Sequence, residues 1–167
     1  MNIKYIFVIL ILLNLHSCAE LPSFQQKEPK QGLLNQSLEV LEPETSRANF
    51  NKGISQIGMR TMIRKGLIEF GLFKSIVNFN GDLQLIVINN EKDEIQELNF
   101  LSVRHKIKLT FTILKDKREV YKKDFDADEV ATGTEKFIYI ERVRYATEKA
   151  THRCLEQFLE DISKQKL

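Results

Sequence analysis

The most regular pattern in the chain is an alternation of apolar and polar residues, which is typical of a strand with one buried face. Residues 103–113 alternate in this way, and after a turn at 116–118 the alternation returns over 121–128. A register with Ile113 opposite Tyr121 aligns the two apolar sets, so we expect antiparallel pairing in that register. It sets Leu109 opposite Phe125 and Ile107 opposite Ala127 inside, and Lys108 opposite Asp126 and Lys106 opposite Asp128 outside.

Two other segments repeat their apolar residues at helical spacing. The first predicts a helix over 48–70 that ends at Gly71, where a left-handed backbone is favourable. The second follows Thr132-Gly133-Thr134-Glu135, which has the form of a capping box, and predicts a long helix to about Lys164. Small residues in the middle of its apolar stripe should let it pack closely on a sheet. The stripe comprises Phe137, Ile140, Val143, Ala146, Ala150, Cys154, Phe158 and Ile162.

Between these helices lie two further runs with strand character, 73–79 and 83–89. Asn80-Gly81 stands between them, and Asn-Gly between two such runs is a typical hairpin signal. The order of elements predicts an α+β domain with an antiparallel sheet of about four strands and two helices packed on one face.

The first residues have the pattern of a secretion signal. Lys4 is followed by an apolar run over 5–15, interrupted only by Asn14. Eleven residues rise about 16 Å as a helix, roughly half of a ~30 Å hydrocarbon core, so the run is too short for a membrane span. The residues after it are polar and contain prolines, which favours an exported signal segment over a buried core helix.

Leu15-His16-Ser17-Cys18 follows directly and resembles the lipobox of bacterial lipoproteins, with Leu three residues before Cys and a small residue just before it. The resemblance implies that Cys18 receives a diacylglycerol on its thiol and becomes an acylated N-terminus. His16 departs from the small or aliphatic residue that is usual at its place. Ser17-Cys18-Ala19 also fits ordinary signal peptidase, which would release a soluble chain beginning at Glu20.

Ala19 after the cysteine resembles the sorting pattern of Gram-negative lipoproteins, which implies a periplasm-facing location at the outer membrane. From there to about Asn49 the chain is polar and holds all of its prolines, so we predict a flexible tether with room for a short strand over 37–41. The predicted organisation is a signal peptide at 1–17, a lipidated Cys18 with a tether at 18–47, and an α+β periplasmic domain at 48–167.

Composition excludes several functional classes. The 167 residues carry 25 Lys and Arg against 23 Asp and Glu, without the concentrated positive charge of a nucleic-acid binder. After Cys18 there is no glycine-rich phosphate loop, nucleophile elbow, HExxH or CxxC motif. We therefore expect no nucleic-acid partner, no catalytic residues, no enzyme activity and no cofactor.

Two charged groups on the predicted strand pair are candidate binding sites. Arg104, Lys106 and Lys108 share one face and form a possible anion-binding stripe or an ordinary solvated face. Asp124, Asp126, Asp128 and Glu135 have the spacing of calcium-loop ligands, but Glu129 stands where such a loop needs glycine and the segment before them is a predicted strand. We therefore predict no metal site.

Three side chains with reactive chemistry have simpler structural interpretations. His105 lies on the inward face of its predicted strand, and His152 falls on the polar side of the last helix. Cys154 would be the one free thiol of the mature chain, and its place in the apolar stripe predicts a small packing residue.

The stretch from Ser46 to Lys164 resembles small periplasmic lipoprotein domains of Gram-negative bacteria, in the segments EFGLF at 69–73, DLQL at 82–85 and ERVRYATEKA at 141–150. Such domains include auxiliary lipoproteins of envelope lipid transporters and assembly factors for outer-membrane components. The resemblance implies a non-enzymatic, membrane-anchored accessory or structural component of an envelope transport or assembly complex, with an envelope protein partner. The alternative is a periplasmic carrier or binding protein for a lipid or another anionic ligand.

Overall fold

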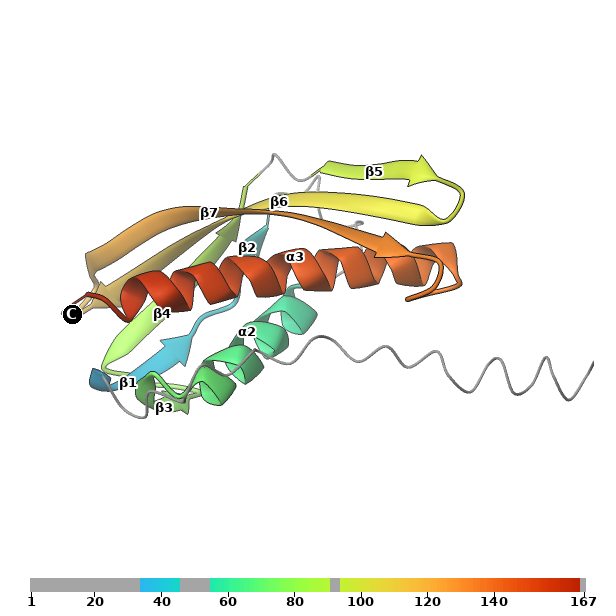
Figure 1. Ribbon diagram of the computed structural model, residues 1–167. Helices are drawn as coiled ribbons and strands as arrows, with labels where there is room; N and C mark the ends of the chain where they lie inside the picture. The colour runs from blue at the N-terminus through green and yellow to red at the C-terminus, as the bar shows by residue number, and fades with distance from the viewer. Residues whose placement is uncertain (1–33, 46–54, 91–93, 166–167) are drawn as a thin grey trace, which may run out of the picture.

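The computed structural model describes residues 34–45, 55–90 and 94–165, which form two helices and a seven-stranded mixed sheet (Figure 1). The helices are α2 (Gln56–Phe70) and α3 (Tyr139–Ile162). The strands are β1 (Leu34–Val40), β2 (Glu44–Thr45), β3 (Phe73–Val77), β4 (Leu83–Asn89), β5 (Glu94–Asn99), β6 (Ser102–Lys115) and β7 (Arg118–Thr132). The predicted α+β class is confirmed, but the sheet is larger than four strands and is not purely antiparallel.

The ladder between β6 and β7 has the predicted register. All five expected pairs occur, from Ile113 opposite Tyr121 to Lys106 opposite Asp128. Asp116 and Lys117 join the strands with positive φ angles of 50° and 64°, the backbone that a two-residue hairpin turn requires. β4 and β5 pair with different parts of the other edge of β6, which makes β6 the central strand of this half of the sheet.

The predicted hairpin between β3 and β4 is wrong, because β1 lies between these strands and pairs in parallel with both. The turn between them passes close to β1, since a Cβ atom on Gly81 would lie 2.6 Å from the backbone nitrogen of Glu39. Asp82 also accepts hydrogen bonds from the backbone nitrogen and hydroxyl of Ser37, at 2.8 and 2.7 Å. The Asn-Gly turn therefore fits against a third strand.

Residues 34–45, which the sequence pattern assigned to the tether, form strands β1 and β2 of the sheet. Leu38 and Val40 are fully buried, so this segment contributes to the core. The strand is also longer than the short one expected at 37–41. The signal segment, Cys18 and the start of the predicted first helix lie outside the described residues.

The two helices differ in how well their ends were predicted. Gly71 caps the C-terminal end of α2 with a left-handed φ of 67°, as expected, and Ser55 caps its N-terminal end with a hydroxyl that accepts from the Gly58 nitrogen. α3 begins later than the capping-box pattern indicated, at Tyr139. The Glu135 carboxylate does accept from the nitrogen of Thr132, but this contact closes a turn at the end of β7.

The larger of two hydrophobic clusters lies between the sheet and the two helices, which cover the same face (Figure 1), and a smaller one joins Val143, Tyr145 and Ala146 of α3 to Val103 and Ala131. Buried side chains of both helices belong to the larger cluster together with the inward residues of β4, β6 and β7, so both helices cover the same face, as predicted. Phe158 of α3 stacks on Phe111 of β6 with ring centroids 4.6 Å apart. Neither described helix is long and apolar enough to cross a membrane.

Six residues of the predicted α3 stripe are buried, and two are not. Val143, Ala146, Ala150, Cys154, Phe158 and Ile162 face the core. Phe137 and Ile140 are instead 81% and 64% exposed, because the chain turns at 133–138 and carries the start of the helix beyond the edge of the core. The prediction that these two residues join the core is therefore wrong.

Candidate functional site

Arg104, Lys106 and Lys108 lie together along β6, as the alternation predicted. Arg104 donates two hydrogen bonds of 2.7 Å to the Asp128 carboxylate, and the Lys108 ammonium lies 2.9 Å from Asp124. Neither carboxylate lies directly opposite its cation. Each belongs to the residue that stands two positions along β7 from the directly opposed one. Two of the three cations are thus paired within the sheet, and an anion would have to displace a carboxylate to reach them.

Two acidic residues of this ladder, Asp124 and Asp128, are held by hydrogen bonds and ion pairs to side chains of β6. Hydrogen bonds from Thr110 and Lys108 lower the pKa of Asp124, and the Arg104 guanidinium lowers the pKa of Asp128. Within residues 34–45, 55–90 and 94–165, no three His, Cys, Asp or Glu side chains are grouped so that they could hold a metal ion.

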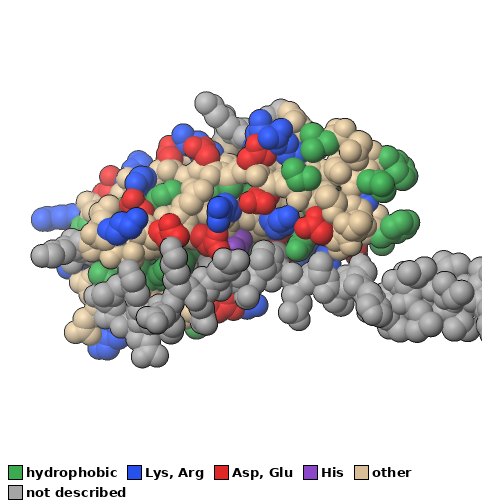
Figure 2. Space-filling model, viewed as in Figure 1, with side chains coloured by type: hydrophobic (Ala, Val, Ile, Leu, Met, Phe, Trp, Pro, Cys, Tyr) green, Lys and Arg blue, Asp and Glu red, His purple; other side chains and the backbone are tan. Residues whose placement is uncertain are grey.

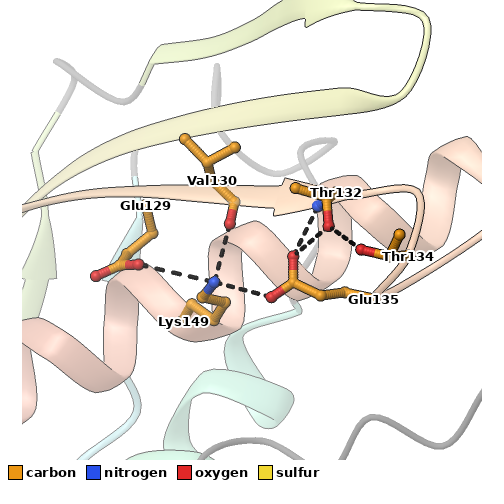
Figure 3. Close-up of polar contacts among 6 residues, drawn as sticks. All are labelled: Glu129, Val130, Thr132, Thr134, Glu135 and Lys149. Carbon is orange, nitrogen blue, oxygen red and sulfur yellow. Dashed lines mark hydrogen bonds and ion pairs between the residues drawn. The ribbon is translucent and has the colours of Figure 1, made fainter.

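A second group of polar contacts joins the end of β7 to α3 (Figure 3). The Lys149 ammonium lies 2.9 Å from the Val130 carbonyl oxygen, 3.1 Å from Glu135 and 3.9 Å from Glu129. Burial raises the pKa of Glu135, but hydrogen bonds from Thr132 and Lys149 outweigh it and the net shift is downward. This contact fixes the turn that follows β7 onto the helix.

The residues with reactive side chains are buried packing residues. His105 is fully buried, and its Nδ1 lies 2.8 Å from the Thr147 hydroxyl. Cys154 is also fully buried, with its sulfur 3.4 Å from the Phe125 carbonyl oxygen. His152 is buried as well, contrary to its predicted place on the polar side of α3, and burial lowers its pKa.

An open hollow lies beside the C-terminal end of α2. Its lining mixes apolar and polar side chains from α2, β1 and β3, and none of them belongs to the basic stripe on β6. The lining residues are Asn35, Leu67, Ile68, Gly71, Phe73, Lys74, Ser75 and Ile76. The basic stripe on β6 is therefore separate from this hollow, whose lining includes one cationic residue, Lys74.

Large hydrophobic side chains are exposed at one end of the domain, which we call the apolar end. They come from the turn between β5 and β6 and from the start of α3 with the residues just before it, and Figure 2 shows hydrophobic side chains gathered there. Ser102 pairs with Thr132, which brings these two parts of the chain side by side. The apolar end comprises Leu98, Phe100, Leu101, Phe137, Ile138, Tyr139 and Ile140.

A buried arginine joins the two loops of the apolar end. The Arg142 guanidinium, on the first turn of α3, donates to the carbonyl oxygen of Phe100 at 3.1 Å. It also donates to the carbonyl oxygens of Lys136 at 3.1 Å and Phe137 at 2.5 Å. Arg142 itself is only 4% exposed. The loop backbones are therefore held from beneath while their hydrophobic side chains point outward.

The size of the apolar end is unusual for a surface that stays in water. Phe100 and Phe137 are 85% and 81% exposed, and Tyr139 is 44% exposed. With ~150–250 Å² for each aromatic side chain, these three expose about 300–500 Å². The largest apolar patch on a typical monomer is about 300–600 Å², and four aliphatic side chains enlarge this one further. The apolar end thus has the composition of an interaction surface.

The sequence pattern did not predict this surface. Helical spacing placed Phe137 and Ile140 in the apolar stripe of α3, and nothing in the pattern distinguished Arg142. The available signal was a pair of uncharged runs in which nearly every residue is large and apolar, Leu98-Asn99-Phe100-Leu101 and Phe137-Ile138-Tyr139-Ile140.

No protein-family model matches the chain, and no curated protein sequence matches it. Solved structures do match its fold. A Xanthomonas campestris protein of the family DUF330 aligns with a TM-score of 0.63 at 14% identity, over 83% of this chain and 90% of that one. A candidate lipoprotein from Caulobacter crescentus aligns with a TM-score of 0.54 at 13% identity, over 76% of this chain and 88% of that one. The chain therefore has the fold of small lipoprotein-like domains from Gram-negative bacteria, as the resemblance in its sequence implied.

Proposed function

We propose that this protein is a non-enzymatic lipoprotein, anchored to the periplasmic side of the cell envelope through Cys18, and that it serves as an accessory or structural component of an envelope transport or assembly complex. The lipobox-like pattern before Cys18 supports the anchor, and Ala19 favours the outer membrane. The fold that it shares with a candidate lipoprotein is consistent with this role.

The observation that carries the proposal is the apolar end. Seven large hydrophobic side chains are presented to solvent around the β5–β6 turn and the start of α3, two parts of the chain that the buried Arg142 connects. In contrast, His105 and Cys154 have their polar atoms in contact with core partners. The unusual feature of the described residues is therefore an exposed hydrophobic surface, which suits a protein that works by association.

The intact mass of the mature protein extracted from membranes tests the anchor. We expect a chain that starts at Cys18 and carries the added mass of acyl groups. A chain that starts at Glu20 without lipid would contradict the proposal and would favour a soluble periplasmic carrier.

Crosslinking in cells tests the accessory role. A photoreactive residue at Phe100 should capture a defined membrane-embedded protein of the envelope, whereas the same residue at Lys117, in the turn between β6 and β7, is the control. Equal labelling at both positions would contradict a specific contact at the apolar end.

A further inference from the structure

We propose that the apolar end inserts into the interfacial region of a neutral lipid bilayer and gives the domain a membrane contact of its own, in addition to the acyl anchor. This inference deepens the proposed function and rests on it for the anchor that keeps the domain near a bilayer. Three features of the apolar end favour a bilayer as its occupant.

The first feature is the absence of charge at the apolar end. The segments 98–102 and 137–140 contain no charged residue, so their insertion takes no charged side chain of their own out of water. Glu97 flanks the first segment, and Lys136, Glu141 and the buried Arg142 flank the second, so two positive and two negative charges border the apolar end. Attraction to a membrane must then come from apolar burial, and it should not require anionic lipid or fall with added salt.

The second feature is the hydrogen bonding of backbone carbonyl groups at the apolar end. A carbonyl oxygen that faces water needs no protein partner, but an unpaired one in hydrocarbon costs several kcal/mol. Arg142 donates to three such oxygens, on Phe100, Lys136 and Phe137. The apolar end can therefore lose its water without leaving these carbonyl groups unpaired.

The third feature is the position of the apolar end relative to the anchor. β6 begins at the apolar end and its 14 residues rise about 46 Å toward the other end, where Leu114 faces the start of β4. β1 runs parallel to β4, so Leu34 lies at that opposite end. Residues 19–33 span at most about 50 Å, which lets a domain anchored at Cys18 tilt until its apolar end meets the same membrane.

Tryptophan fluorescence can test this inference directly, because the chain contains no tryptophan. We would place one tryptophan by Phe100→Trp in the full acylated chain, incorporated in phosphatidylcholine vesicles with brominated acyl chains, which quench nearby indole. Phe79→Trp is the matched control, since Phe79 is 77% exposed and lies just before β4 at the opposite end. We expect the brominated lipid to quench the fluorescence of the tryptophan at position 100, to the same extent in high salt. We expect no quenching of the tryptophan at position 79.

A second variant separates insertion from simple anchoring. Phe137→Ser with Ile140→Ser, in the Phe100→Trp chain, should weaken the quenching while flotation with vesicles, which reports the acyl anchor, stays unchanged. Failure of the chain to float would contradict the proposed acyl anchor. Quenching measured with excess vesicles would then still test whether the apolar end inserts into the bilayer.

Two outcomes would overturn the inference. Equal fluorescence of the Phe100→Trp chain in brominated and ordinary lipid would show that the apolar end stays out of the bilayer. A blue shift that appears without lipid and grows with protein concentration would show that a second copy of the chain covers it.

Discussion

Arg142 combines two properties that rarely occur in one residue, a nearly complete burial and a permanent positive charge. Its guanidinium is placed among carbonyl oxygens of two loops that are distant in sequence. The planar group with several donors suits this role, because it can bond three acceptors that a lysine ammonium would meet less well.

Replacing Arg142 with methionine should therefore loosen the apolar end. We expect the free energy of unfolding in urea to fall by about 1.5–3 kcal/mol or more, because hydrogen bonds to a charged group are lost. Amide hydrogen exchange in 98–102 and 135–140 should also become faster. Arg144→Met is the control, since its exposed pair with Glu148 is of the kind that contributes about 0–1 kcal/mol. Equal stability of the two variants would contradict this role for Arg142.

The paired charges on β6 and β7 predict a dependence of stability on pH. The Arg104 guanidinium lowers the pKa of Asp128 in the folded state, so its stabilisation is complete above the ordinary value of about 4 and is lost as pH falls through the lower folded pKa. Asp128→Asn should make the loss of unfolding free energy on acidification smaller, as measured by urea denaturation at neutral and acid pH. Asp126→Asn on the same strand is the control. An unchanged acid dependence would mean that the pair adds no stability.

The two hairpin signals in this sequence had different outcomes for a physical reason. β6 and β7 are neighbours in the chain, each has one apolar face, and a shift by one residue would bury charges, so local pattern determines their register. β3 and β4 are also close in sequence, but each pairs with β1. A parallel pairing joins strands that are far apart in sequence, so no short turn motif between them predicts it.

Gly81 is the residue that permits this arrangement, which leads to a test. Gly81→Ala would bring a Cβ within 3 Å of Glu39 backbone and side-chain atoms, so we expect β1 to be displaced and stability to fall steeply. Gly71→Ala meets no neighbouring atom and should lose only the ~1–2 kcal/mol of left-handed strain. Thermal unfolding of the two variants would measure the difference. A larger loss for Gly71→Ala would contradict the close packing.

The extent of the folded unit also depends on distant contacts. The polar, proline-containing composition up to Asn49 is typical of a tether, yet residues 34–45 supply two strands and the fully buried Leu38 and Val40. Composition averages over a window and misses a seven-residue strand whose partners lie dozens of residues further along the chain.

A pair of shortened chains tests the boundary. A chain that begins at residue 33 retains β1 and should unfold cooperatively, whereas one that begins at Ala48, the start of the domain predicted from sequence, should not. Loss of β1 leaves β3 and β4 without their shared partner and removes Leu38 and Val40 from the core. Circular dichroism during heating would distinguish the two, and equal cooperative transitions would show that β1 is dispensable.

The sequence by itself determined the α+β class, the β6–β7 register, the end of α2 at Gly71 and the buried part of α3, because each depends on a local periodicity or a local backbone preference. The tertiary structure decided the insertion of β1, the late start of α3, the burial of His152 and the apolar end. Each of these depends on contacts between segments that are remote in the chain. The Arg142 contact with Phe100 is the clearest case, since neither residue is informative until folding places the two loops together.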